Sequence, residues 1–335
     1  MVSSSRGRNG QCLRKSTFLD ACTGAAILGR VRKAKDAGGP LFADGLAAAG
    51  PAAGRPAAGA RKSRSAKAST KKEVPREKRV GSLRVVEAPR RARRPPPPLP
   101  PEELLHRAMQ ALTPRSRALW ARRGLAHPGK LDRTTKSMLL RQLYLALYEE
   151  RRFQKAAEIA DQIVVLAVLP DVAHQDAARA KQGLGDIDAA AGHLRLAARI
   201  GPANRKAFHW WTLGSLYFLA HRYDDAISAL TRASRWGTTD KPLYQGHLAI
   251  ARCAKGELVA DLGNLIDRLA GVPAGQGYGR FVLGQLAFYD RRWTDARRYL
   301  ESFLTRTLGG RAAMTIALEG EIAVAQRTLS SLTEG

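Results

Sequence analysis

Histidines, glycines and carboxylates are the residues of this 335-residue chain whose types could do chemistry, but their spacing supports none. The seven histidines lack the spacing of metal ligands, and no HExxH occurs. They are His106, His127, His174, His193, His209, His221 and His247. The glycine-rich stretch "AGQGYGRF" has neither GxGxxG nor GK[ST], so it predicts a turn between helices. No nucleophile is placed with a base, so the sequence predicts no enzyme, no metal and no cofactor.

The cysteines bear on the cellular compartment. Cys12, Cys22 and Cys253 show no CxxC spacing and no paired framework, which argues against a disulfide scaffold and a zinc site. The longest downstream stretch without charge, "WWTLGSLYFLA", is shorter than the roughly 18 residues that span a bilayer. We therefore expect a cytoplasmic protein with no transmembrane segment.

Residues 1–100 differ sharply from the remainder in composition. They hold 23 Lys+Arg against 6 Asp+Glu, a net of +17 out of +27 for the chain, and 10 of the 17 prolines. Phe18 and Phe42 are their only aromatics, so they cannot bury enough apolar surface to offset the entropy of ordering. We expect a disordered, basic, Pro/Ala-rich arm.

The basic arm has two interpretations. Clustered Lys and Arg gain free energy by releasing counterions at phosphates, so residues 61–94 are a candidate for weak, nonspecific nucleic-acid contact. The alternative is a solvated tail that is basic only because the coding sequence is rich in Arg and Ala.

From about Glu102 onward, apolar residues recur at three- and four-residue spacing, which predicts helices throughout. One stretch reads Trp210-x2-Leu213-Gly214-x2-Tyr217, followed by Ala226-x3-Leu230 and Ala233. The alanine position of its second half recurs at intervals of 34, 36, 35, 35 and 29 residues. The positions are Ala156, Ala190, Ala226, Asp261, Ala296 and Ala325.

This pattern resembles the tetratricopeptide repeat, whose signature is W-x2-L-G-x2-Y followed by A-x3-F at a period of about 34 residues. The resemblance implies an all-α, right-handed α-solenoid of about six helix-turn-helix units that share a continuous core. A small residue on each first helix would let the second helix approach closely. These residues are Ala178, Gly214, Ala249, Gly284 and Ala313.

The chain departs from the pattern at both ends and in the fourth unit. Residues 101–136 are expected to form a capping helical hairpin before the solenoid at 137–335, with Thr113 as N-cap and Pro114 as first helical residue. Asp261 and Arg268 are polar where the fourth unit should be apolar, so we expect this unit to be the loosest. The last unit is short and is expected to be partly a terminal cap.

Trp210 and Trp211 are adjacent, so on a helix their side chains point about 100° apart. The resemblance implies that Trp210, in the tryptophan position, faces the stacked second helices, whereas Trp211 points to the inner surface lined by first helices. On this assignment Trp210→Ala would cost about 3–5 kcal/mol and Trp211→Ala less than about 1 kcal/mol.

Equivalent positions on the other first helices predict the rest of an inner, concave groove. The predicted contact residues are Arg141, Gln175, Arg179, Gln182, Phe208, Trp211, Ser215, Phe218, Tyr278, Phe281, Gln285 and Phe288. This groove suits an extended or helical peptide with an acidic group followed by apolar anchors. The alternative is that its aromatics pack only against a neighbouring helix or the chain's own tail.

The sequence thus predicts a non-catalytic protein–protein interaction scaffold that binds a peptide or partner helix in this groove. The alternative function is a nucleic-acid-associated protein acting through the basic arm. A weaker third possibility is a regulatory subunit whose repeats control an enzyme.

Overall fold

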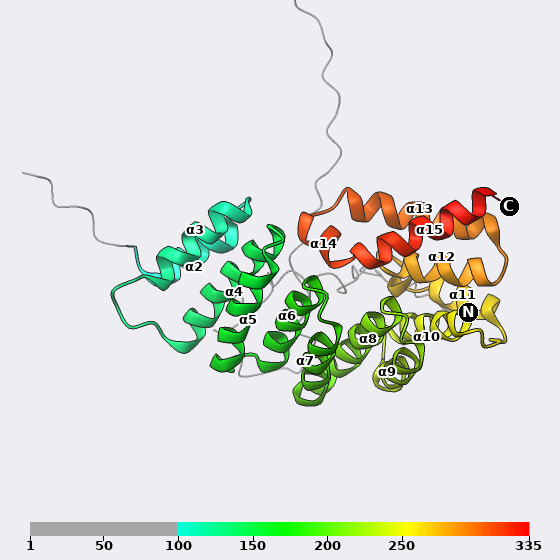
Figure 1. The fold of residues 1–335 in the computed structure, drawn as a ribbon, viewed down its shortest axis with the longest axis horizontal. Helices are drawn as coiled ribbons and strands as arrows, with labels where there is room; N and C mark the ends of the chain where they lie inside the picture. The colour runs from blue at the N-terminus through cyan, green and yellow to red at the C-terminus, as the bar shows by residue number, and fades with distance from the viewer. Residues whose placement is uncertain (1–98, 335) are drawn as a thin grey trace, which may run out of the picture. The chain divides into compact units, whose positions relative to one another are not determined.

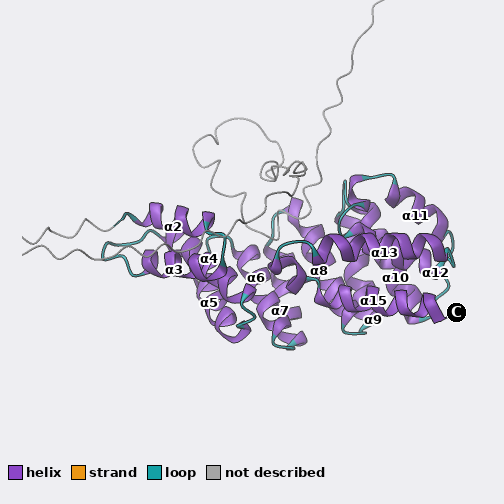
Figure 2. Cartoon of the chain, turned by 90° about the horizontal axis from the view of Figure 1, so that it is seen from above, coloured by secondary structure: helices purple, strands orange, loops and turns teal. Residues whose placement is uncertain are grey.

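The computed structural model describes residues 99–334, and all regular structure within that range is helical, without strands (Figures 1 and 2). Nearly all of the predicted basic arm, including residues 61–94, lies outside the described residues. Among the helices that are described, none is long and apolar enough to cross a membrane.

Between residues 99 and 334, fourteen α-helices and one short 3₁₀ helix follow one another through short connections. They are α2 (Pro101–Gln110), α3 (Pro114–Leu125), α4 (Arg133–Glu149), α5 (Phe153–Leu166), α6 (Pro170–Gly183), α7 (Ile187–Ile200), α8 (Ala203–Leu219), α9 (Tyr223–Trp236), α10 (Lys241–Lys255), α11 (Leu262–Ala270), η2 (Pro273–Gly275), α12 (Gly279–Tyr289), α13 (Trp293–Leu308), α14 (Ala312–Ala317) and α15 (Glu319–Glu334). Each helix from α2 to α10 packs against the next one in the chain.

Local capping explains where several helices begin. The Thr113 hydroxyl accepts a hydrogen bond from the Ser116 N–H at 3.2 Å, with Pro114 in the first turn, which confirms the predicted N-cap of α3. Asp132 accepts from two amides at the start of α4, and Asp186 accepts from the Ala189 amide at the start of α7. These helix starts are therefore fixed by short-range sequence.

Small residues allow the helices of a pair to approach closely. A Cβ added to Gly214 on α8 would lie 2.5 Å from Cγ of Leu230 on α9. The same holds for Gly284 on α12, where an added Cβ would lie 2.5 Å from Cγ of Leu300 on α13. In these two pairs, the small residue on the first helix therefore allows the close approach of the second helix that the sequence predicts.

One turn recurs between the two helices of each pair. Positive φ angles fall at Arg151, Gly185, His221, Gly256 and Arg291, at intervals of 34, 36, 35 and 35 residues. In each turn, the N–H of the next residue donates to the carbonyl five positions earlier, over 2.8–3.0 Å. This is the hydrogen bond of a Schellman-type helix end. The periodicity seen in the sequence is therefore also present in the backbone.

The fourth pair differs from the predicted register. Its second helix, α11, has nine residues and buries Leu262, Ile266 and Leu269. Asp261, placed by the sequence pattern in the buried alanine position, is exposed and precedes the helix with φ 57°. The assignment of the buried position to Asp261 was wrong by one residue, because a carboxylate is costly to bury and Leu262 takes its place.

The C-terminal segment does not form another stacked pair. The six-residue α14 has no buried residue and contacts α4, which lies far earlier in the chain. Helix α15 packs against both α12 and α13 (Figure 1). The predicted last repeat unit is thus replaced by a helix that covers earlier ones.

We predict that Gly214→Ala lowers the free energy of unfolding by about 1–3 kcal/mol, because the added methyl overlaps Leu230. Gly192→Ala in α7 is the matched control, since no atom lies within 4 Å of its added Cβ. The control should be stabilised by about 0.4–1 kcal/mol. Urea denaturation measures both, and equal effects would contradict the close approach.

Candidate functional site

Six of the predicted groove residues converge on one cavity of about 110 Å³. They are Arg179, Gln182, Phe208, Trp211, Ser215 and Tyr278. The first helices α4, α6 and α8 line one side, and the end of α13 with α14 and α15 lines the other. Most of the wall is apolar, and further contributions come from Tyr144, Leu145, Tyr148, Thr212, Leu216, Leu219, Gly277, Arg306, Thr307, Ala313, Met314, Ala317, Leu318 and Glu321.

Trp211 lies at the centre of the aromatic wall. Its ring centroid is 4.8 Å from that of Tyr278 in an edge-to-face arrangement, and 5.9 Å from that of Phe208. Its indole N–H donates to Nδ1 of His247 at 3.1 Å. Such pairing satisfies the one polar group of a buried indole.

The predicted faces of the two tryptophans need correction. Trp211 is only 6% exposed, whereas Trp210 is partly buried and stacks under Arg232, whose guanidinium carbon is 4.7 Å from its ring. The inner side of α8 is covered by Tyr278 and the C-terminal helices, so the residue directed inward is the more buried one.

His247 has no catalytic arrangement. Burial lowers the pKa of its imidazole to about 3, so the ring is neutral. Because Nδ1 accepts from Trp211, the proton belongs on Nε2, which finds no hydrogen-bond partner in the part of the chain that the structure describes. The ring instead meets Phe218 edge-on, with centroids 5.3 Å apart. This histidine is a packing residue that fixes the indole.

The floor of the cavity carries a buried acid. Ser215 donates to Oε1 of Glu321 at 3.0 Å, and Tyr278 donates to the same oxygen at 3.2 Å. Burial raises the pKa of Glu321 above its usual range, although the two hydroxyls partly offset this. Burial also raises the pKa of Tyr278, with Glu321 adding to the effect, so the phenol stays protonated.

Two further features face the cavity. Arg306 at the end of α13 is exposed, and it forms a cationic edge together with Arg179. The Tyr144 hydroxyl is buried and makes no hydrogen bond within the described residues. This hydroxyl is therefore an exception to the rule that buried hydroxyls are paired.

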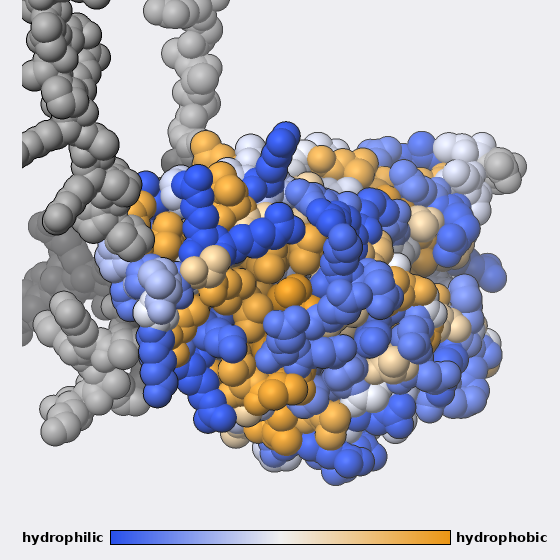
Figure 3. Space-filling model, turned by 60° about the vertical axis from the view of Figure 1, so that its left-hand side comes forward, coloured by the Kyte–Doolittle hydropathy of each residue, from blue (hydrophilic) through white to orange (hydrophobic). Residues whose placement is uncertain are grey.

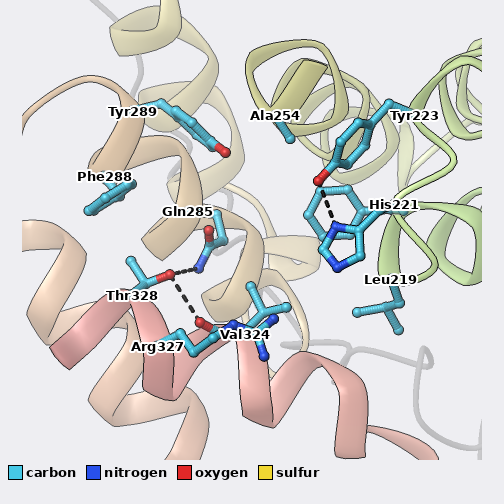
Figure 4. A pocket seen from close by; sticks show the side chains of 11 residues that line it. Leu219, His221, Tyr223, Ala254, Gln285, Phe288, Tyr289, Val324, Arg327 and Thr328 are labelled. Carbon is cyan, nitrogen blue, oxygen red and sulfur yellow. Dashed lines mark hydrogen bonds between the residues drawn. The ribbon is translucent and has the colours of Figure 1, made fainter. Parts of the chain in front are cut away.

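A second cavity, of about 160 Å³, lies beneath α15 and is drawn in Figure 4. It collects three more predicted groove residues, Phe218, Gln285 and Phe288. Gln285 donates from Nε2 to the Thr328 hydroxyl of α15 at 2.9 Å. The C-terminal part of the predicted groove is therefore covered by the chain's own tail, one of the alternatives left open by the sequence.

Three predicted contact residues line neither cavity, and their assignment to the groove was wrong. Arg141 is buried and pairs with Asp176 at 2.7 Å, because an arginine inside the fold needs a carboxylate partner. Gln175 is also buried. Phe281 is fully buried against Phe303, because α13 covers that side of α12.

Three other histidines, His174, His193 and His209, hold helices together. Nδ1 of His174 and Nδ1 of His193 are 2.9 Å apart, and burial lowers both pKa values, so one neutral ring donates to the other. His209 contacts Asp171 at 3.0 Å. Burial alone would raise the pKa of Asp171, but its hydrogen bonds with His209 and Arg205 outweigh burial and hold the pKa well below its usual range. Within residues 99–334, no group of three metal-ligand side chains occurs.

Sequence reasoning missed the far wall of the first cavity, above all Arg306, Met314 and Glu321. Glu321 lies 106 residues from its partner Ser215 along the chain. The only signal was that the last repeat copy is short, and this does not say where the segment packs.

The chain matches no protein-family model, and it matches no curated protein.

We predict that Trp211→Ala lowers the free energy of unfolding by about 3–5 kcal/mol, as for other buried aromatics. Trp210→Ala should cost less than half as much, because the ring is partly exposed and its contact with Arg232 is worth about 0.5–1 kcal/mol. Urea denaturation of both variants is the measurement. A larger loss in the Trp210 variant would contradict the observed burial.

Glu321→Gln tests the buried acid. Since the pKa of Glu321 is higher in the fold than its ordinary value of 4.5, protonation favours the folded state. Wild-type stability should therefore fall, relative to the Gln variant, as the pH rises above about 4.5. The charged groups that line the same cavity are Arg179 and Arg306, and both are common to the two chains. Urea denaturation from pH 4 to pH 8 measures the difference, and a constant difference would contradict the shift.

Proposed function

We propose that this chain is a non-catalytic protein-interaction scaffold that captures a peptide or helix on its inner surface, with the 110 Å³ cavity as its anchor site. The observation that carries the proposal is the convergence there of six residues predicted from their positions on first helices. Concave, mostly apolar sites with a few polar groups are the usual ligand sites of proteins.

A right-handed, tetratricopeptide-like α-solenoid is part of the proposal. It is supported by the five turns at intervals of 34 to 36 residues and by the glycine-mediated approach of α8 to α9. Buried contacts between first helices have similar sequence separations. Arg141 pairs with Asp176 over 35 residues, and Trp211 bonds His247 over 36.

The chemistry of the cavity defines the ligand class. A dry cavity of about 150 Å³ binds benzene, so this slightly smaller one suits a single ring or branched aliphatic side chain. Arg306 lines the cavity and is exposed, so it suits a carboxylate of the ligand. The ligand is then a peptide that carries one large apolar side chain next to an acidic residue. Figure 3 shows hydrophobic surface bordered by hydrophilic side chains on one face, as at many interaction sites.

The alternative of nucleic-acid association depends on residues 61–94, which lie outside the described residues. It stays a prediction from charge alone.

Peptide display on the full chain tests the anchor site. Selected peptides should share an aromatic or branched aliphatic residue beside Asp or Glu. Ala317→Phe fills the cavity from α14 and should weaken these peptides at least tenfold, whereas Ala312→Phe, exposed on the same helix, should not. Fluorescence anisotropy measures the affinities.

Charge reversal gives an independent arm of the same test. Arg306→Glu should remove the preference for acidic peptides, and Arg311→Glu, exposed and outside the cavity, should keep it. If the selected peptides bind the Ala317→Phe chain with the affinity of wild type, the cavity is not the anchor site.

A further inference from the structure

Helix α15 contacts the first helices α8 and α12 and the second helix α13. Gly320 lies so close to Leu219 of α8 that an added Cβ would be 2.8 Å from its Cδ1. Further along, Thr328 bonds Gln285 of α12, and the Leu332 carbonyl accepts from Arg297 of α13 at 3.2 Å. Helix α15 thus contacts α12 and α13, which are close to it in sequence, and α8, which lies far earlier in the chain.

This helix is held by few buried side chains. Of its described side chains, only Glu321, Ile322 and Ala325 are buried, and α14 before it buries none. The 160 Å³ cavity lies directly under it, between Val324 and Phe288 (Figure 4), so contacts that a close-packed interface would make are missing. Segments with few buried contacts open at lower free energy than the rest of a fold.

The contact has a chemical preference. The hydroxyls of Ser215 and Tyr278 both donate to the same carboxyl oxygen of Glu321. The two hydroxyls are also 3.3 Å apart and can bond each other, but they cannot both donate without an acceptor such as a carboxyl or amide oxygen. An aliphatic or cationic side chain supplies no such acceptor and is therefore disfavoured at this position. Ile322 directly follows the acid, and the small Ala325 allows close approach.

We infer that the inner face of α8 and α12 is a helix-binding surface that α15 occupies in the isolated chain and that a partner helix takes in its place. The partner is an amphipathic helix with an acidic residue, an aliphatic residue directly after it and a small residue four positions after the acid. The carboxyl of its acidic residue accepts the two hydrogen bonds that Ser215 and Tyr278 now donate to Glu321. This inference rests on the proposed function, since it assigns the partner's helix to the same inner surface, where the partner replaces the wall that α15 contributes to the 110 Å³ cavity.

The probe is a labelled peptide of residues 318–334, offered to the full chain and followed by fluorescence anisotropy. Ala325 is fully buried, so Ala325→Arg should displace the chain's own α15 from the surface. The variant chain should then bind the peptide at least tenfold more tightly than wild type. Gln326→Arg, exposed on the same helix, should behave as wild type. A peptide with Glu321→Gln should still bind, whereas one with Glu321→Lys should lose binding at least tenfold.

Hydrogen exchange on the unmodified chain gives a second measurement. Amides of α15 should exchange through local openings that α12 and α13 do not share. The inference is overturned if α15 is protected as long as α12, if a folded Ala325→Arg chain binds no peptide, or if the Lys peptide binds equally well.

Two other outcomes are also decisive. A wild-type dimer that the peptide dissociates would assign the surface to a second copy of the chain and overturn the partner assignment. If display-selected peptides bind the cavity but the 318–334 peptide does not bind the Ala325→Arg chain, this inference falls and the proposed function stands.

Discussion

Buried polar contacts between successive first helices are the constraint on which the rest of the arrangement depends. Arg141 of α4 pairs with Asp176 of α6, and Trp211 of α8 bonds His247 of α10. A buried charge or indole N–H is costly when it is unpaired, so each contact fixes the register of one helix against the next along their axes. Apolar packing alone tolerates small shifts, whereas these contacts do not. These buried contacts hold α4 against α6 and α8 against α10, and so they fix the geometry of the surface that these helices form.

Much of the fold could be predicted from the sequence because it depends on short-range rules. Thr113 caps α3 as expected, and Gly214 lets Leu230 approach, because capping and close approach need only neighbouring or paired residues. The predicted buried position at Asp261 was wrong, because a repeat pattern does not include the cost of burying a carboxylate. A one-residue shift to Leu262 follows from that cost.

The candidate site was predictable only in part. The near wall, with Phe208 and Ser215, follows from helical spacing. The far wall depends on contacts between distant segments, such as that between Glu319 and Arg151, which are 168 residues apart. No local pattern encodes such a contact. Trp211 was therefore placed on the correct side of α8 but in the wrong environment, because its cover comes from elsewhere in the chain.

The recurring turn has a consequence for how such a chain can change in length. Each of five helix pairs is joined by a turn with one residue of positive φ at the same position. Since the turn is the same, a whole pair could be duplicated or deleted without a new loop. Helix α15, however, reaches from Leu219 to Arg297 and has a fixed length of 16 residues. Insertion of a pair between these points would leave the tail too short to span the distance. Helix α15 therefore limits how many residues can be inserted between α8 and α13 while both of its contacts are kept.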